Sequence, residues 1–127
     1  SPNSIAQWAA IAALDGPINF IADNCRAFAL RRQLVCDALN AMPGVTCAEP
    51  DGAFYCFFSV AGLTDSLGFA HAILQHTKVG LAPGLAFGPA GEGYLRLCYA
   101  QDEPVLNEAF DRLEKGFQTA RQAVMTA

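Results

Sequence analysis

The sequence VGLAPGLAFG at residues 79–88, followed after two residues by GEGYLRLCYA at residues 91–100, is the most informative part of this chain. It places one arginine, Arg96, in an otherwise apolar segment directly after a glycine-rich loop. A guanidinium group does not lose its proton, and leaving it dry and unpaired is costly, so it requires an anion. This stretch therefore predicts a strand whose Arg96 binds a carboxylate.

Alternation along this predicted strand places Arg96 on one face, together with Tyr94, and Leu95 and Leu97 on the other. A planar guanidinium on a rigid strand suits bidentate binding of a carboxylate. The partner carboxylate is either that of a ligand or one of the chain's own acids, such as Glu92, and the spacing alone leaves both open.

The glycines before the strand raise a second question, which is whether they bind phosphate. The loop contains Gly84, Gly88, Gly91 and Gly93, but it lacks the terminal Lys-Ser/Thr of a P-loop and does not run from a strand into a helix. We therefore expect these glycines to supply positive φ angles in tight turns.

Composition limits the class of protein. With 127 residues, of which 53% are hydrophobic and 16% charged, the chain is expected to form one compact domain. The net charge of -4 gives no basic face, so nucleic acid is not expected as a partner. Its apolar runs are shorter than the roughly 20 residues of a membrane span, and no leader pattern is present, so we expect no membrane partner and a cytoplasmic location.

The chain has five cysteines and two histidines but no spacing typical of a metal site. The cysteines are odd in number and include no C-x-x-C pair, so neither a disulfide framework nor a zinc cluster is predicted. They are interpreted as small buried residues, and the histidines as surface residues. The positions concerned are Cys25, Cys36, Cys47, Cys56, Cys98, His71 and His76.

Periodicity predicts four helices. The first covers residues 4–14 and ends before Gly16-Pro17. A longer one ends at Pro43, with a stripe that we expect to be buried over its whole length, formed by Ile21, Cys25, Phe28, Val35, Leu39 and Met42. A third helix, capped by Asp65 or Ser66, is expected to bury one side, which is formed by Phe69, Ala70, Ile73 and Leu74. The last begins near Pro104 and is amphipathic.

Four segments are predicted as strands: residues 45–48, 53–60, 79–82 and 94–100. The first two are separated by a turn sequence at residues 49–52 and are expected to be neighbours, with the second central because it is apolar on both faces. Strands interleaved with helices predict an α/β or α+β sandwich, with a small, partly antiparallel sheet of about four strands against helices.

Several of these blocks together resemble a known family. The spacing of Pro83-Gly84, Phe87-Gly88, Gly91-Glu92-Gly93-Tyr94 and Arg96 is similar to that in the small domain of fold type I pyridoxal-phosphate aminotransferases, of the aspartate-aminotransferase-like class I/II group. The resemblance extends through PNSIAQWAA at residues 2–10, PGV at 43–45 and DGAFY at 51–55. It implies a connector helix at residues 1–16 from a large domain that precedes this chain, and a C-terminal small domain at 17–127.

The resemblance also implies roles for individual residues. Arg96 would bind the substrate α-carboxylate, and Ser1 and Asn3 would belong to a loop that reaches the neighbouring subunit's active site in a homodimer. The alternative for Asn3 is a helix cap. Neither Lys78 nor Lys115 lies in the serine-rich context of the family's Schiff-base lysine, so no catalytic residue, no cofactor-binding residue and no metal ligand is expected in this chain.

The function implied is that of a C-terminal fragment of an aminotransferase, which transfers an amino group between an amino acid and a 2-oxo acid. Pyridoxal 5'-phosphate would be bound in the parent protein and not by this fragment, which alone is expected to be inactive. The alternative is a stand-alone, non-catalytic module that binds small carboxylates or another protein. A ferredoxin-like regulatory domain is a third option, but it leaves the Pro-Gly, Phe-Gly and Tyr-x-Arg series unexplained.

Overall fold

The structure is a computed structural model that describes residues 1–125. The chain forms four α-helices, four short strands and two 3-10 turns in that range. In order they are α1 (Ser4–Asp15), α2 (Asn19–Ala41), β1 (Val45–Cys47), β2 (Tyr55–Val60), α3 (Ser66–Thr77), β3 (Ala82–Pro83), η1 (Gly84–Phe87), η2 (Pro89–Gly91), β4 (Tyr94–Cys98) and α4 (Glu103–Met125).

The strands form one sheet in the order β1-β2-β4-β3, and each neighbouring pair is antiparallel. The adjacent strands β1 and β2 were predicted, as was the central position of β2, and both predictions are confirmed. The sheet is therefore antiparallel throughout, where the sequence indicated only a partly antiparallel one.

The predicted strand at residues 79–82 is wrong in its position, because β3 begins only at Ala82. Lys78 ends α3 in the left-handed conformation, at φ 61°. The Val79 N–H then donates to the Thr77 hydroxyl at 3.1 Å and is used to close the helix end. The chain joins the sheet three residues later, at Ala82.

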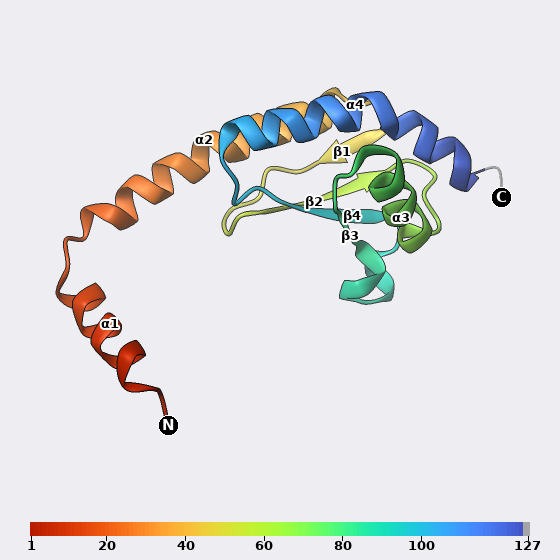
Figure 1. The fold of residues 1–127 in the computed structure, drawn as a ribbon. Helices are drawn as coiled ribbons and strands as arrows, with labels where there is room; N and C mark the ends of the chain where they lie inside the picture. The colour runs from red at the N-terminus through yellow and green to blue at the C-terminus, as the bar shows by residue number, and fades with distance from the viewer. Residues whose placement is uncertain (126–127) are drawn as a thin grey trace.

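Helices α2, α3 and α4 cover one face of the sheet, as Figure 1 shows. The buried residues of β2 and β4 alternate with exposed ones, and only the alternate set meets the helices. The other face of the sheet carries no α-helix within residues 1–125, and only the short η1 contacts it through Phe87, so the molecule is a two-layer sandwich with one largely open face. The core includes Val35, Leu39, Phe58, Phe69, Ile73, Leu95, Leu113 and Phe117.

Two predicted helix faces are only partly buried. Along α2, Val35 and Leu39 lie in the core and Phe28 packs against it, beside Phe54 and Tyr99. Ile21 and Cys25, nearer the start of the helix, are exposed. On α3 the predicted face is right for Phe69, Ala70 and Ile73 and wrong for Leu74, which is 47% exposed.

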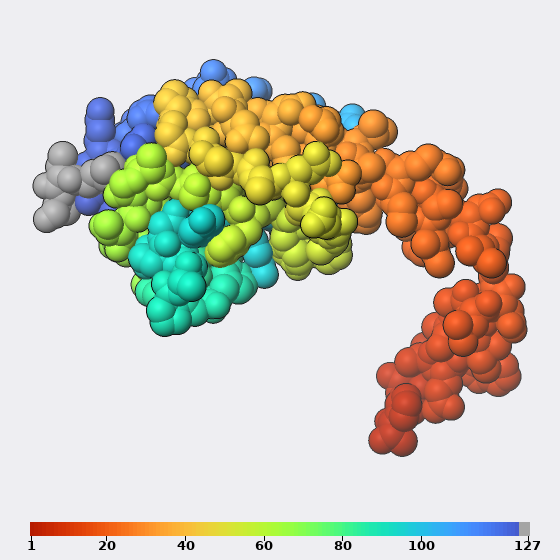
Figure 2. Space-filling view, turned by 180° about the vertical axis from the view of Figure 1, so that it is seen from behind, coloured from red at the N-terminus to blue at the C-terminus, as the bar shows by residue number. Residues whose placement is uncertain are grey.

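Helix α1 stands apart from the sandwich in Figures 1 and 2, and none of its residues is buried. The predicted cap is confirmed, because the Asn3 side chain accepts a hydrogen bond from the Ala6 N–H at 2.7 Å. Among residues 1–125 no single helix is long and apolar enough to cross a membrane. Helices α1 and α2 satisfy that criterion only as a pair, by length and composition, and they are bent by 87° at the break between them.

Candidate functional site

Arg96 lies on the open face of the sheet, at the middle of β4. Phe57 of β2 is its partner in the register on one side, and Ala82 of β3 on the other. Its neighbours Leu95 and Leu97 point into the helix-covered core, as the predicted alternation requires. The strand is thus fixed from both sides, and it presents a half-buried guanidinium group outward.

Two aromatic rings hold the guanidinium group of Arg96. Its Cζ atom lies 4.2 Å from the centroid of the Tyr55 ring and 4.3 Å from that of the Phe87 ring. Such cation–π contacts stabilise by about 0.5–2 kcal/mol each and consume none of the N–H donors. Within residues 1–125 no carboxylate forms an ion pair with Arg96 and no acceptor takes a hydrogen bond from its side chain. The donors are therefore available to a ligand.

Three aromatic side chains form an apolar surface beside the guanidinium group of Arg96. Phe57 stacks on Tyr94, with ring centroids 5.0 Å apart and planes 3° from parallel, and it meets the edge of Phe87 at 5.8 Å. All three rings remain partly exposed. An anion that enters here pairs with Arg96 next to apolar surface, where a charge pair is stronger than in bulk water.

Glu92 is not the partner of Arg96, so the internal salt bridge considered for this pair is not formed. Its carboxylate accepts hydrogen bonds from the Gly93 N–H at 3.0 Å and the Ser66 N–H at 2.7 Å. It also accepts one from the Ser66 hydroxyl at 3.3 Å. The Gly93 N–H first, and then the Ser66 groups, hold the pKa of Glu92 below its ordinary value. Glu92 thus joins the start of α3 to the loop that precedes β4.

Close backbone packing shapes that loop. A Cβ atom on Gly84 would lie 1.9 Å from the Gly91 carbonyl oxygen, and one on Gly91 would lie 2.1 Å from that of Gly84. The positive φ angles predicted for the loop glycines occur at Gly88 and Gly93 and not at these two. At Gly84 and Gly91 the reason for glycine is the close approach of two chain segments, which carries η1, and with it Phe87, to the sheet.

The other predicted site residues do not gather at Arg96. Ser1 and Asn3 lie at the exposed start of the chain, beside a helix that stands apart from the sheet. Lys78 donates to the Gln75 carbonyl at the end of its own helix, and Lys115 is exposed on α4.

Cysteine burial was predicted only in part. Cys25 and Cys98 are exposed, so the interpretation of all five as buried residues is wrong for these two. The remaining three are buried and lie together, which their sequence spacing did not indicate. His71 and His76 are exposed, as predicted.

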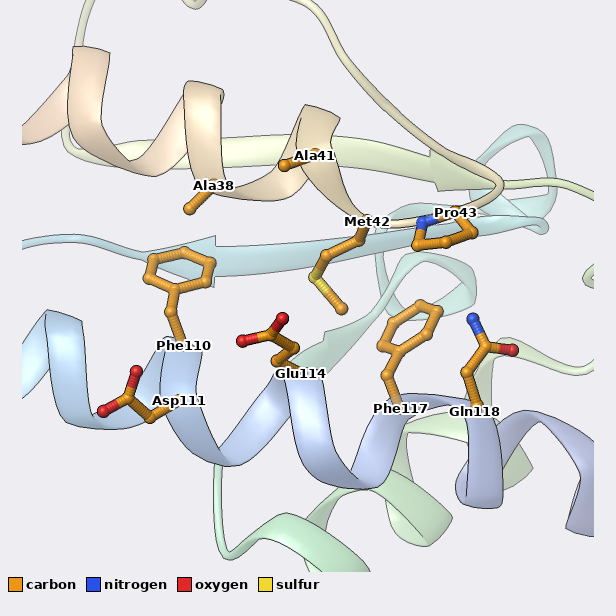
Figure 3. Close-up of a pocket in the computed structure, with 9 residues that line it drawn as sticks. All are labelled: Ala38, Ala41, Met42, Pro43, Phe110, Asp111, Glu114, Phe117 and Gln118. Carbon is orange, nitrogen blue, oxygen red and sulfur yellow. The ribbon is translucent and has the colours of Figure 1, made fainter.

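A cavity of about 440 Å³ lies away from Arg96, between the end of α2 and the middle of α4, as Figure 3 shows. Met42 at the end of α2 points toward Glu114 and Phe117 of α4. None of the described residues that line the cavity is cationic, so these residues are not suited to a carboxylate ligand. Its lining consists of Ala38, Ala41, Met42, Pro43, Phe110, Asp111, Glu114, Phe117 and Gln118.

Comparison with known proteins gives the class of protein to which this fold belongs. Residues 1–113 match the family model for aminotransferases of class I and II. The chain therefore belongs to this family, and its fold is that of the aspartate-aminotransferase-like, fold type I members.

Individual relatives agree with this assignment. The aspartate/prephenate aminotransferase of Cereibacter sphaeroides is 42% identical over 90% of this chain and 31% of its own length. The aspartate aminotransferase of Geobacillus stearothermophilus is 39% identical over 95% of this chain and 32% of its own length. The alanine aminotransferase from Pyrococcus furiosus superposes with a TM-score of 0.84 at 32% identity, over 93% of this chain and 30% of its own. The chain thus spans about a third of the length of these relatives.

The family implies pyridoxal phosphate, and the residues described here do not fit that cofactor by themselves. Formation of an imine requires a lysine amine that faces the site. Lys78 is tied to its own helix end and Lys115 lies on the outer side of α4, so neither offers such an amine. What the described residues offer instead is the half-buried guanidinium group of Arg96 on the sheet.

Proposed function

We propose that this chain is the substrate-carboxylate-binding part of a pyridoxal-phosphate-dependent aminotransferase, which moves an amino group between an amino acid and a 2-oxo acid. Arg96 binds the α-carboxylate of both. The observation that carries this proposal is an arginine held by two rings on an open sheet face, with its N–H donors unused by any of the described residues 1–125.

Arg96 contributes by orientation. A bidentate pair fixes the plane of the substrate carboxylate, and so restricts rotation of the substrate about its Cα. Correct alignment of the reacting bond accounts for several kcal/mol of barrier reduction in reactions of this kind. Tyr55 and Phe87 keep the guanidinium in place, so the entropy of ordering that side chain is already lost before substrate binds.

The partners of this chain follow from the same proposal. A large domain supplies the cofactor and its lysine, covers the open face of the sheet, and packs against α1. A second copy of the whole enzyme completes a homodimer, and the enzyme works in the cytoplasm. On this view the chain alone does not catalyse transamination, since it holds only the carboxylate end of the substrate.

The test is the kinetics of Arg96→Ala in the aminotransferase that contains this chain. Loss of a charge-assisted, partly desolvated pair is expected to lower kcat/KM by about 100-fold or more for the amino acid and the 2-oxo acid alike. The matched control is Arg112→Ala, which removes an exposed arginine paired only with Glu108 on α4 and should leave kcat/KM unchanged. Equal kinetics for wild type and Arg96→Ala would contradict the assignment.

A further inference from the structure

Three cysteines converge in the core on the helix-covered side of the sheet, away from the face that carries Arg96. Cys36 comes from α2, Cys47 from the end of β1 and Cys56 from β2. The Sγ atom of Cys36 lies 4.0 Å from that of Cys47 and 3.8 Å from that of Cys56, and all three sulfurs lie within 4.8 Å of one another. Each residue is at most 6% exposed.

These separations match those of a metal bound by three thiolates. Three sulfurs that surround one ion in a plane, each at a bond length of about 2.3 Å, lie about 4.0 Å from one another. Two of the observed separations are within 0.2 Å of this spacing, and the third is below 4.8 Å. The sulfur atoms would therefore have to move only slightly to bind an ion.

The backbone around the three sulfurs is held in place by a side chain of α2. Asn40, one helical turn after Cys36, accepts a hydrogen bond from the Cys47 N–H at 2.9 Å and donates to the Cys47 carbonyl at 3.0 Å. This pair of hydrogen bonds between the helix and the strand fixes Cys47 relative to Cys36. Cys56 is placed on the same face by the antiparallel pairing of β1 with β2.

We propose that Cys36, Cys47 and Cys56 form a binding site for one soft monovalent metal ion, Cu(I). Three sulfur donors favour a soft ion, and an ion that accepts three-coordination fits a site to which no histidine or carboxylate within residues 1–125 adds a fourth ligand. This inference is independent of the proposed aminotransferase function.

Arg32 lies one helical turn before Cys36 on α2, but its guanidinium group is paired with the Glu49 carboxylate at 2.9 Å and donates to the Pro50 carbonyl at 3.0 Å, so it does not balance charge at the sulfurs. Each Cu–S bond forms as one S–H proton leaves to solvent, so binding by all three thiols releases three protons and transfers no electron. Because the sulfurs are buried, the ion enters while the chain folds or when α2 opens from the sheet.

The test uses the full 127-residue chain with Cys25→Ala and Cys98→Ala, which removes both exposed thiols and retains the three buried ones. The variant is refolded under reducing, oxygen-free conditions with Cu(I), and bound copper is measured in competition with bicinchoninate. We expect one Cu(I) per chain and a thermal unfolding midpoint higher than that of the copper-free protein. Adding Cys36→Ala should weaken Cu(I) binding by about 100-fold or more.

X-ray absorption of the copper-loaded Cys25→Ala/Cys98→Ala protein gives a second readout that needs no core substitution. Three sulfurs at about 2.3 Å would support the site. No retained copper, or a shell of nitrogen and oxygen, would overturn it and leave the three thiols as core packing only. Copper that binds wild type but is lost from the Cys25→Ala/Cys98→Ala variant would equally overturn it, since the exposed thiols would then be the ligands.

Discussion

At the scale of single residues, the charged groups of Arg96 and Glu92 differ in how the protein holds them. Arg96 donates no side-chain hydrogen bond to another residue of the described part of the chain, and it is held through its contacts with Tyr55 and Phe87. Glu92 is fully engaged with the N–H groups of Gly93 and Ser66. We propose that the charge of Arg96 binds a ligand, whereas the charge of Glu92 supports the loop that brings Phe87 to Arg96.

Glu92→Gln is predicted to lower stability in a pH-dependent way. The pKa of Glu92 in the folded chain is lowered from an ordinary value of 4.5, so its ionised form is stabilised by folding. That contribution is present above the ordinary pKa and is lost as the pH falls through the lowered one. Urea unfolding midpoints should therefore separate wild type from the variant at neutral pH and converge in acid. Glu114→Gln, at an exposed position, is the control, and an equal effect there would refute the role of Glu92.

Sequence reasoning correctly predicted the face of the strand on which Arg96 lies, because strand alternation depends only on neighbours in the chain. It did not identify Tyr55 and Phe87 as the rings that hold it, because their approach depends on strand register and on the path of η1. The cysteine cluster was missed for the same reason. Cys36 is 11 residues from Cys47 and 20 from Cys56, and only the packing of α2 on the sheet brings them together.

At the scale of elements, the loop between β3 and β4 decides where the site lies. Gly84 and Gly91 contact each other backbone to backbone, so η1 and η2 are packed as one unit. The Ser66 hydroxyl accepts a hydrogen bond from the Leu85 N–H at 3.2 Å and ties this unit to α3. The glycine-rich loop, which was considered as a phosphate-binding loop, thus allows close backbone packing beside the strand that carries Arg96.

Gly84→Ala is predicted to destabilise the fold by about 2–4 kcal/mol, because the added methyl group overlaps backbone that cannot move away alone. Gly80→Ala is the matched control, since a Cβ there meets nothing within 4 Å. The free energy of unfolding from denaturant titration measures both. Similar values for the two variants would mean that the contact of Gly84 with Gly91 does not constrain the loop.

At the scale of the whole molecule, apolar surface is concentrated where no part of the described chain covers it. Trp8 is 72% exposed and Leu14 is 86% exposed on α1, and Phe20 and Ile21 continue this surface onto the first half of α2. Patches of this kind mark interfaces. The predicted division into a connector helix at residues 1–16 and a small domain at 17–127 stays a prediction, and the separate position of α1 is compatible with it.

The isolated chain is predicted to self-associate through α1. Sedimentation velocity should show species larger than a monomer that become more abundant with concentration, and Trp8→Ser/Leu14→Ser should shift the distribution toward the monomer. His71→Ser, an exposed substitution on α3, should leave it unchanged. A strictly monomeric wild-type chain would contradict the idea that this surface requires a partner.

The pairing of Arg96 with a substrate carboxylate is the central claim, and a double-mutant cycle between protein and ligand tests it most directly. The dissociation constants of a substrate amino acid and of its carboxamide would be measured for the aminotransferase that contains this chain and for its Arg96→Ala variant. The wild type is predicted to prefer the carboxylate by about 100-fold, and the variant to lose that preference, because each change removes the same interaction. An unchanged preference for the carboxylate in Arg96→Ala would show that another group binds it.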